Sequence, residues 1–379
     1  MRLLLIHFEN SNPTYLTKDM CSYPYYLGKN HGWDCTYGYF TSGSKLKNEN
    51  FEKYCKLLYL GEDVEYSAKR DIVKKYLREH ATEYDVLSFF NYGGATYKLA
   101  LYAKKINPNI IVYNKLDMGE GGFSHFYDGS FIRKIHLLPE YWKSRGIDLF
   151  TVENIKFYNV LRNMKLFSNR LEYLPNMVSM FGVDANKIKS KSRKKRIITI
   201  GRLGSHQKNN ELFMEALCMI NPEVLNDWEI YFVGRDAGNF KKYVEEIVKN
   251  NSWLNKKIIF TGEIYDRNKL YELCAESRII CMSSRGESFG IATIEGMYWG
   301  AYPIITNYGS IAYDITDNEN YGIVTEHNAK SLSIALNKII TQKNLDELNN
   351  EIMSYAEKKF NCDYWACKLN EYLLAKINR

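Results

Sequence analysis

The sequence of 379 residues predicts an α/β protein with two parallel sheets, one in each half of the chain. Short apolar segments alternate with stretches of helical period along both halves. Several of these segments lead through a turn into a helix, which is typical of parallel sheets with crossover helices. The length and the hydrophobic content of 45% are sufficient for two separate cores.

Each half has five predicted strands. In the first half they span residues 2–8, 34–40, 85–90, 110–114 and 149–152. In the second half they span residues 196–200, 229–233, 257–260, 278–282 and 302–306. Helices are expected to begin near Lys18, Ala95, Asn210 and Ile291. The polar stretch after Leu174-Pro175-Asn176 is expected to join two domains, the first over 1–180 and the second over 181–355.

Composition excludes several classes of protein. No apolar run approaches the roughly 18 residues that a membrane-spanning helix needs, and the apolar start of the chain is too short for a signal peptide. The eight cysteines lack a CxxC or His-paired zinc spacing and are expected to be reduced thiols of a cytoplasmic protein. The G-x-G-x-x-G fingerprint of an NAD-dependent dehydrogenase is absent from the sequence.

Much of the net charge of +7 lies in residues 187–196, K-I-K-S-K-S-R-K-K-R. One interpretation is a solvated linker. The other is contact with the anionic inner face of a membrane, since each Lys or Arg near such a surface gains about 1 kcal/mol. No recognition motif supports nucleic-acid binding.

Residues 285–300, R-G-E-S-F-G-I-A-T-I-E-G-M-Y-W-G, place Glu287 before a tight turn and Glu295 in the helix that follows it. The free N–H groups at the start of this helix favour an anion such as a phosphate. Both carboxylates could accept hydrogen bonds from hydroxyls that flank the anion, which describes a nucleotide-sugar. Ordinary complementation of the helix dipole by a glutamate is the alternative interpretation.

A second motif, I-I-T-I-G-R-L-G-S-H-Q-K, begins at Ile197 and places Arg202 and Lys208 on the loop after a predicted strand. Two cations on one loop are suited to the oxygens of a diphosphate, although either could be a solvated surface charge. Their position upstream of the two glutamates favours the diphosphate.

With these motifs the sequence resembles the retaining GT-B glycosyltransferases of the family 4 type. The resemblance covers residues 197–324 and also includes I-Y-F-V-G, I-I-F-T-G-E-I and W-G-A-Y-P-I-I-T. It implies two Rossmann-like domains with parallel sheets facing across a cleft, an N-terminal acceptor domain and a C-terminal donor domain. It also implies that a last helix, within 356–379, crosses back to the first domain.

The resemblance implies roles for individual residues. Arg202 and Lys208 would hold the diphosphate, Glu287 would contact the donor sugar, and Glu295 would bind the ribose. Catalysis is thus expected from Glu287, Arg202 and Lys208. Further donor contacts are expected from Ser288, Phe289, Gly290, Ile291, Gly201, Gly234, Gly262 and Ile264. No metal or other cofactor is expected, and the sequence has no Asp-x-Asp triplet.

The first half departs from the pattern of the family. H-F-E-N-S-N-P-T-Y-L-T replaces a Gly-Gly loop after the first strand, and V-Y-N-K-L-D-M-G-E-G-G offers Lys115 and Asp117 where many relatives have a His-Asp pair. Lys115 and Asp117 are expected to contact the sugar or the acceptor in the cleft. His125, close by in the sequence, is either a further contact or a surface histidine.

The expected activity is that of a hexosyltransferase (EC 2.4): transfer of a sugar, with retained configuration, from a UDP-sugar to a glycan, lipid-linked or glycolipid hydroxyl in bacterial surface polysaccharide synthesis. Two alternatives remain open. One is a GT-B epimerase or hydrolase acting on UDP-N-acetylhexosamine, and the other is a non-catalytic partner subunit of a glycosyltransferase.

Overall fold

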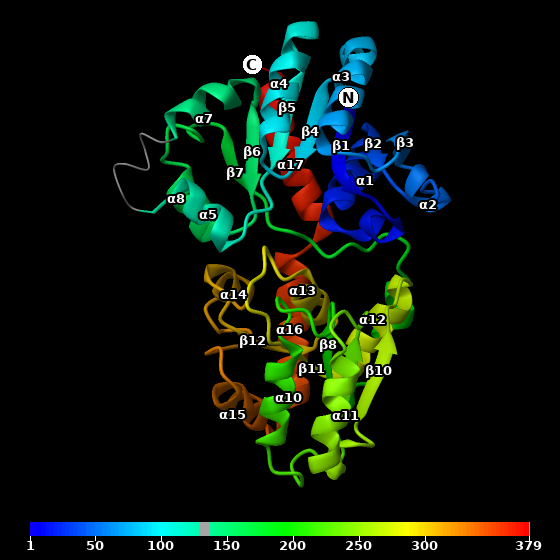
Figure 1. Ribbon diagram of the computed structural model, residues 1–379, viewed down its shortest axis with the longest axis vertical. Coiled ribbons are helices and arrows are strands. Elements are labelled where there is room, and N and C mark those ends of the chain that lie inside the picture. The colour runs from blue at the N-terminus through cyan, green and yellow to red at the C-terminus, as the bar shows by residue number, and fades with distance from the viewer. Residues whose placement is uncertain (129–136, 379) are drawn as a thin grey trace. The chain divides into compact units, whose positions relative to one another are not determined.

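The computed structural model describes residues 1–128 and 137–378 and consists of two compact units (Figure 1). Unit 1 comprises Met1–Phe181 and the C-terminal segment that begins at Cys362, and unit 2 comprises Gly182–Asn361. Each unit is built on a parallel sheet with helices, so the predicted α/β class with two parallel sheets is confirmed.

The described residues of unit 1 form a seven-stranded parallel sheet in the order β3-β2-β1-β4-β5-β6-β7. Its strands are β1 (Arg2–Asn10), β2 (Asp34–Phe40), β3 (Cys55–Gly61), β4 (Val86–Phe90), β5 (Ile111–Lys115), β6 (Leu149–Val152) and β7 (Leu171–Tyr173). The sheet is buried on both faces. Leu3 and Leu5 of β1 pack into one hydrophobic cluster, whereas Leu4 and Ile6 pack into another, because successive side chains of a strand point to opposite faces.

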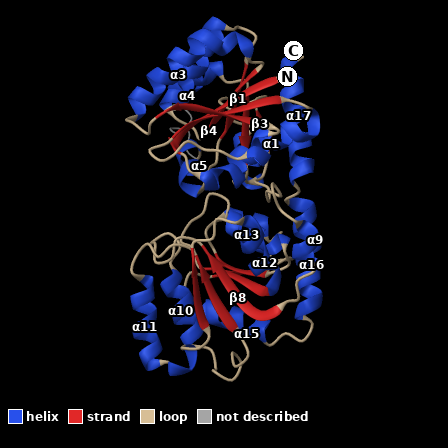
Figure 2. Cartoon of the chain, turned by 90° about the vertical axis from the view of Figure 1, so that its right-hand side faces the viewer, coloured by secondary structure: helices blue, strands red, loops and turns tan. Residues whose placement is uncertain are grey.

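The helices of unit 1 cover both faces of its sheet (Figure 2). They are α1 (Asp19–His31), α2 (Glu49–Glu52), α3 (Tyr66–His80), α4 (Gly94–Ile106), α5 (Glu120–Phe126), α7 (Leu138–Lys143), α8 (Ile155–Leu161) and α17 (Cys362–Ile377), with short 3-10 turns at Pro13–Thr17, Ala81–Glu83 and Ser144–Gly146. Leu369 and Leu373 of α17 are buried in the same cluster as Leu27 of α1. The last helix of the chain therefore belongs to the core of unit 1.

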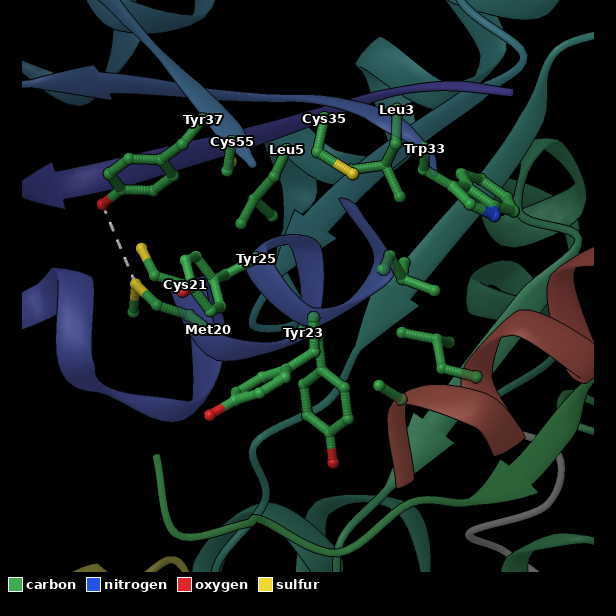
Figure 3. Packing of buried hydrophobic residues seen from close by; sticks show 14 of the residues in the cluster. Leu3, Leu5, Met20, Cys21, Tyr23, Tyr25, Trp33, Cys35, Tyr37 and Cys55 are labelled. Carbon is green, nitrogen blue, oxygen red and sulfur yellow. Dashed lines mark hydrogen bonds between the residues drawn. The ribbon is translucent and has the colours of Figure 1, made fainter. Parts of the chain in front are cut away.

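Figure 3 shows this cluster around β1 and α1, with Leu3 and Leu5 above Tyr23 and Trp33 to one side. Trp33 Nε1 also donates a hydrogen bond of 2.9 Å to Asn370 Oδ1 of α17. Apolar burial and a partly buried hydrogen bond thus attach the C-terminal helix to the first strands.

The described residues of unit 2 form a six-stranded parallel sheet in the order β10-β9-β8-β11-β12-β13. Its strands are β8 (Lys194–Ile200), β9 (Glu229–Val233), β10 (Ile258–Gly262), β11 (Ser277–Met282), β12 (Tyr302–Thr306) and β13 (Ile323–Thr325). Its helices are α9 (Ala185–Lys189), α10 (Asn210–Cys218), α11 (Phe240–Asn250), α12 (Arg267–Glu276), α13 (Ile291–Tyr298), α14 (Ser310–Ile315), α15 (Ala329–Ile340) and α16 (Leu345–Lys359), with a 3-10 turn at Ser252–Leu254. In Figure 2, α10 and α11 lie on one side of the sheet and α16 on the other.

The structure differs from the sequence prediction at a few elements. The prediction missed β3, β7 and β13. Each of these strands lies at the edge of its sheet, and most of its side chains are half-buried, so its sequence has little hydrophobic periodicity. In addition, β7 and β13 have only three residues each. The predicted last helix is interrupted, because Phe360 leaves the helical conformation between α16 and α17. None of the described helices is long and apolar enough to cross a membrane.

The basic residues 187–196 are not a free linker, since they form the end of α9 and the start of β8. Six of the seven basic side chains form ion pairs within unit 2. The pairs are Lys187–Glu272, Lys189–Glu357, Lys191–Glu272, Lys194–Glu276, Lys195–Asp227 and Arg196 with both Glu229 and Glu276. Arg193 donates to the Asn350 amide oxygen instead. The solvated-linker interpretation of this segment is therefore wrong.

Arg196 and Lys195 provide a matched test of these ion pairs. The Arg196 side chain is 3% exposed and lies 2.8 Å from both of its carboxylates, whereas the Lys195 side chain is 51% exposed. We expect Arg196→Met to lower the free energy of unfolding by about 2–3 kcal/mol, because it removes the buried guanidinium from Glu229 and leaves Glu276 with Lys194 alone. Lys195→Met should cost less than about 1 kcal/mol. Urea unfolding of both variants checks this, and equal losses would contradict a structural role for the buried pair.

Candidate functional site

Three glycines lie at the carboxyl ends of neighbouring strands in unit 2. Gly201 follows β8, Gly234 follows β9 and Gly262 ends β10. A Cβ on Gly234 would lie 1.8 Å from the Gly201 carbonyl oxygen, and a Cβ on Gly201 would lie 2.9 Å from Lys208 Cε. Glycine is required for this approach, which lets the Lys208 side chain cross the end of the strand. The carboxyl edge of a parallel sheet is where α/β proteins bind their ligands.

Lys208 and Glu287 join two loops at this edge. Lys208 lies between β8 and α10, and Glu287 lies between β11 and α13. Lys208 Nζ is 2.6 Å from Glu287 Oε1, and the Ser284 hydroxyl donates to the same oxygen at 2.6 Å. The two charged side chains are only 14% and 9% exposed. The structure therefore brings together the predicted diphosphate cation and the predicted sugar-binding carboxylate.

Gln207 is a site residue that the sequence analysis missed. Its amide oxygen accepts a hydrogen bond of 2.7 Å from Arg202, and its amide nitrogen donates to the Gly286 carbonyl at 2.9 Å. The Arg285 backbone N–H donates to the Gln207 carbonyl at 2.8 Å. Gln207 thus holds the loop of Arg202 against the loop of Glu287. Because the Gln207 amide is neutral, it adds nothing to the pattern of charged residues in the sequence. Only its position beside Lys208 could have indicated that it belongs to the site.

The start of α13 lies on the same loop as Glu287. Ser288 is exposed, Phe289 is buried against the ring of Phe360, and Gly290 precedes the helix in a left-handed conformation. No side chain caps this end of α13. The first N–H groups of a helix, here beginning with Ile291, have no intrahelical acceptor and carry the positive end of the helix dipole. This end of α13 is suited to an anion.

Glu295 lies one turn inside α13 and is paired with α12. Arg267 Nη1 is 2.6 Å from Glu295 Oε1, and the Tyr271 hydroxyl donates to the same oxygen at 3.3 Å. Burial is the largest single effect on the pKa of Arg267 and lowers it, but the charges of Glu295 and Tyr271 and the hydrogen bond to Glu295 together raise that pKa above its usual value. Ile264 lies on the loop between β10 and α12, next to Gly262. Neither Arg267 nor Tyr271 was predicted from the sequence as a site residue.

In unit 1, Lys115 is the last residue of β5 and Asp117 lies just after it, but the two side chains have different surroundings. Lys115 is 3% exposed and forms an ion pair with the buried Glu153, while Asp19 lies 4.0 Å away. Glu153 also accepts the backbone N–H groups of Asp117 at 3.1 Å and Met118 at 3.2 Å. The ammonium group of Lys115 is thus occupied inside the unit, and Asp117 is the more accessible of the two.

His125 lies in the last turn of α5, where its imidazole is 52% exposed and pairs with Glu140 at 3.1 Å. Its surroundings are those of a surface ion pair on a helix.

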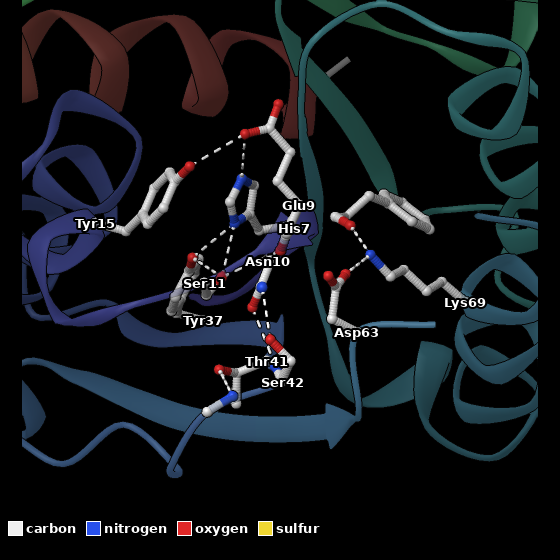
Figure 4. A network of polar contacts seen from close by, with 12 residues as sticks. His7, Glu9, Asn10, Ser11, Tyr15, Tyr37, Thr41, Ser42, Asp63 and Lys69 are labelled. Carbon is white, nitrogen blue, oxygen red and sulfur yellow. Dashed lines mark hydrogen bonds and ion pairs between the residues drawn. The ribbon is translucent and has the colours of Figure 1, made fainter. Parts of the chain in front are cut away.

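The polar loop after β1 is organised by a buried histidine (Figure 4). His7 Nδ1 is 2.9 Å from both the Ser11 and the Tyr37 hydroxyls, and His7 Nε2 is 3.9 Å from the Glu9 carboxylate. Tyr15 donates to that carboxylate at 3.2 Å. Burial, reinforced by the charges of Lys69 and Lys18, lowers the pKa of His7 to about 4. His7 is therefore neutral at pH 7.

These features match a known family of enzymes. Residues 182–359 match the family model described as glycosyl transferases group 1. Residues 182–359 thus belong to the group 1 glycosyltransferase family, as the sequence motifs predicted, and the chain has the GT-B fold.

Solved structures of glycosyltransferases share this fold along nearly the whole chain. A glycosyltransferase from Rickettsia africae has a TM-score of 0.72 at 18% identity, covering 99% of this chain and 98% of its own. HepE from Anabaena, in complex with UDP and glucose, has a TM-score of 0.68 at 15% identity, covering 99% and 100%. WaaG, which is involved in lipopolysaccharide biosynthesis, has a TM-score of 0.65 at 14% identity, covering 98% and 99%. Comparison with curated proteins found no match.

Within residues 1–128 and 137–378, no cluster of three or more His, Cys, Asp or Glu side chains could hold a metal ion.

The depressed pKa of His7 makes stability depend on pH. The unfolded histidine takes up a proton below about pH 6.5, whereas the folded one does so only near pH 4. Folding stability should therefore fall as the pH drops from about 6.5 to about 4, by at most about 3 kcal/mol from this residue. His7→Asn should flatten the change in unfolding free energy over this window, measured by urea denaturation at several pH values. Parallel pH profiles for the two proteins would contradict the buried neutral state of His7.

Proposed function

We propose that this protein is a retaining glycosyltransferase of the family 4 type that transfers a sugar from a nucleotide diphosphate sugar to a hydroxyl group. The ion pair between Lys208 and Glu287 carries the proposal, because it places a cation and a carboxylate from two loops at one edge of the sheet. Arg202 stands on the first loop and the uncapped start of α13 follows the second. Cations and free N–H groups suit a diphosphate, and carboxylates suit the hydroxyls beside it.

In the proposed reaction the acceptor hydroxyl attacks the anomeric carbon while the bond from that carbon to the diphosphate breaks. Negative charge grows on the departing phosphate, where Arg202, Lys208 and the start of α13 stabilise it. The departing phosphate takes the proton of the acceptor hydroxyl, so a protein base is not needed. Glu287 orients the donor sugar, and its contact with Lys208 is shared with the diphosphate when the donor binds.

The proposed donor is a UDP-sugar, and the proposed acceptor is a hydroxyl of a glycan, lipid-linked or glycolipid molecule in bacterial surface polysaccharide synthesis. The structural neighbour HepE was solved with UDP and with UDP-glucose. WaaG is involved in lipopolysaccharide biosynthesis, and WaaB is a lipopolysaccharide outer core galactosyltransferase. Unit 1 is proposed to bind the acceptor, with Asp117 as a contact, on the cytoplasmic side of the membrane. No metal is assigned a role in this proposal.

The two alternative functions, a non-catalytic subunit and an epimerase or hydrolase, receive less support. A non-catalytic subunit would have no need for a buried cation and carboxylate joined across two loops, since such a pair is costly to desolvate. An epimerase or hydrolase of the same fold would share the nucleotide contacts and would differ in its product. Identification of the reaction product therefore distinguishes the proposed transferase from these two alternatives.

The direct test is to incubate the purified protein with a panel of UDP-, GDP- and ADP-sugars in the presence of EDTA. Nucleotide release and the configuration of the released or transferred sugar are followed by NMR. We expect release from one UDP-sugar, unaffected by EDTA, with the anomeric configuration retained. Epimer formation would support the epimerase, and binding without turnover across the panel would support the non-catalytic subunit.

Single-residue variants test the assigned roles. Lys208→Ala and Glu295→Ala should weaken nucleotide binding, whereas Glu287→Ala should chiefly lower turnover. Losing one hydrogen-bond donor of an oxyanion hole typically costs about 2.7–4 kcal/mol in the transition state, and on the same scale we expect Lys208→Ala to slow turnover by about a hundredfold or more. Lys195→Ala, which removes an exposed charge of the same unit, is the control. Unchanged turnover in all three site variants would contradict the roles assigned to these residues.

A membrane contact through residues 187–196 is not part of the proposal, because most of these charges are already paired with carboxylates. We expect the protein to cosediment poorly with vesicles that contain anionic lipid, and a variant with this segment neutralised should behave the same. Strong retention of the wild type alone would restore the membrane interpretation.

A further inference from the structure

Two side chains of α12 hold the carboxylate of Glu295 on α13. Arg267 and Tyr271 are four residues apart and therefore lie on the same face of α12. Both contact Oε1 of Glu295, Arg267 at 2.6 Å and Tyr271 at 3.3 Å. Within the part of the chain that the structure describes, the hydrogen bonds to this carboxylate leave Oε2 for a ligand.

Burial makes this support necessary. The Glu295 side chain is 6% exposed, so a carboxylate without a partner there would lose most of its hydration. Arg267 supplies the opposite charge, and its guanidinium lies 5.8 Å from the centre of the Tyr271 ring. The Arg267 side chain is itself only 14% exposed. The Arg267 guanidinium is therefore held in one position by packing, unlike that of an exposed arginine, which changes rotamer freely.

We propose that Arg267 is a positioning residue for ribose recognition. It fixes Glu295 through Oε1 so that Oε2 accepts hydrogen bonds from the 2′ and 3′ hydroxyls of a nucleotide. This inference rests on the proposed function, in which Glu295 binds the ribose. Arg267 acts through Glu295 and does not itself contact the nucleotide.

A simpler role for Arg267 would be to join α12 to α13 and stabilise unit 2. The two roles differ in what they require of the ligand. If Arg267 positions Glu295, its loss matters only for a nucleotide with ribose hydroxyls, because the preorganised carboxylate has no other ligand group to bind. If Arg267 is merely structural, its loss changes the affinity for every nucleotide by the same factor.

The test compares UDP with 2′,3′-dideoxy-UDP by calorimetric titration. We expect the wild type to bind UDP about tenfold or more tightly than the dideoxy compound, since hydrogen bonds to a charged carboxylate are lost. Arg267→Met should bring this ratio close to one, mainly through weaker binding of UDP. Arg267→Lys should restore part of the ratio, because it keeps the charge but lacks the planar guanidinium.

Arg278→Met is the matched control, because Arg278 is another arginine of unit 2 that pairs with a carboxylate, Asp346 at 3.0 Å. It should leave the ratio at the wild-type value. Thermal melting establishes that the variants are folded, and if Arg267→Met is not, a reduced ratio in Arg267→Lys supports the proposal and a wild-type ratio overturns it.

Other outcomes have distinct meanings. An equal loss of affinity for both ligands in Arg267→Met would overturn the positioning role. A wild type that binds both ligands equally would overturn the ribose contact of Glu295 while leaving donor binding in place. A wild type that binds neither ligand would overturn this inference together with the proposed function.

Discussion

The ion pair between Lys208 and Glu287 is the interaction on which the candidate site depends. It joins a loop that follows β8 to a loop that follows β11, and Gln207 reinforces the junction with hydrogen bonds to both. A buried pair of this kind is costly to desolvate and contributes little net stability. Its value lies in geometry, because it keeps a cation and a carboxylate at fixed positions beside the start of α13.

The site of unit 2 follows one electrostatic rule: each of its buried carboxylates has its own cation. Glu287 is paired with Lys208 and Glu295 with Arg267, both at 2.6 Å. Neither carboxylate is therefore left uncompensated before a ligand arrives. Arg202 is exposed and donates a hydrogen bond to Gln207, and it forms no ion pair with a carboxylate among residues 1–128 and 137–378. The net result favours an anionic ligand such as a diphosphate.

The sequence predicted the α/β class, most of the strands and the loops that carry Arg202, Lys208, Glu287 and Glu295, because each of these features is local. Strand patterns and glycine turns occupy consecutive residues. What it missed depends on contacts between distant segments. Gln207, Arg267 and Tyr271 matter only because the fold brings them to loops or helices 24 to 79 residues away. The linker interpretation of residues 187–196 was wrong for the same reason, since the acidic partners of this segment lie elsewhere in unit 2.

The most direct test of the account is whether Lys208 recognises a diphosphate. Calorimetric titration of UDP and of uridine into the wild type and into Lys208→Met measures this. The account predicts that the wild type binds UDP far more tightly than uridine, and that Lys208→Met loses much of this preference while its affinity for uridine stays the same. A preference that survives in Lys208→Met, or a wild type that does not distinguish the two ligands, would contradict it.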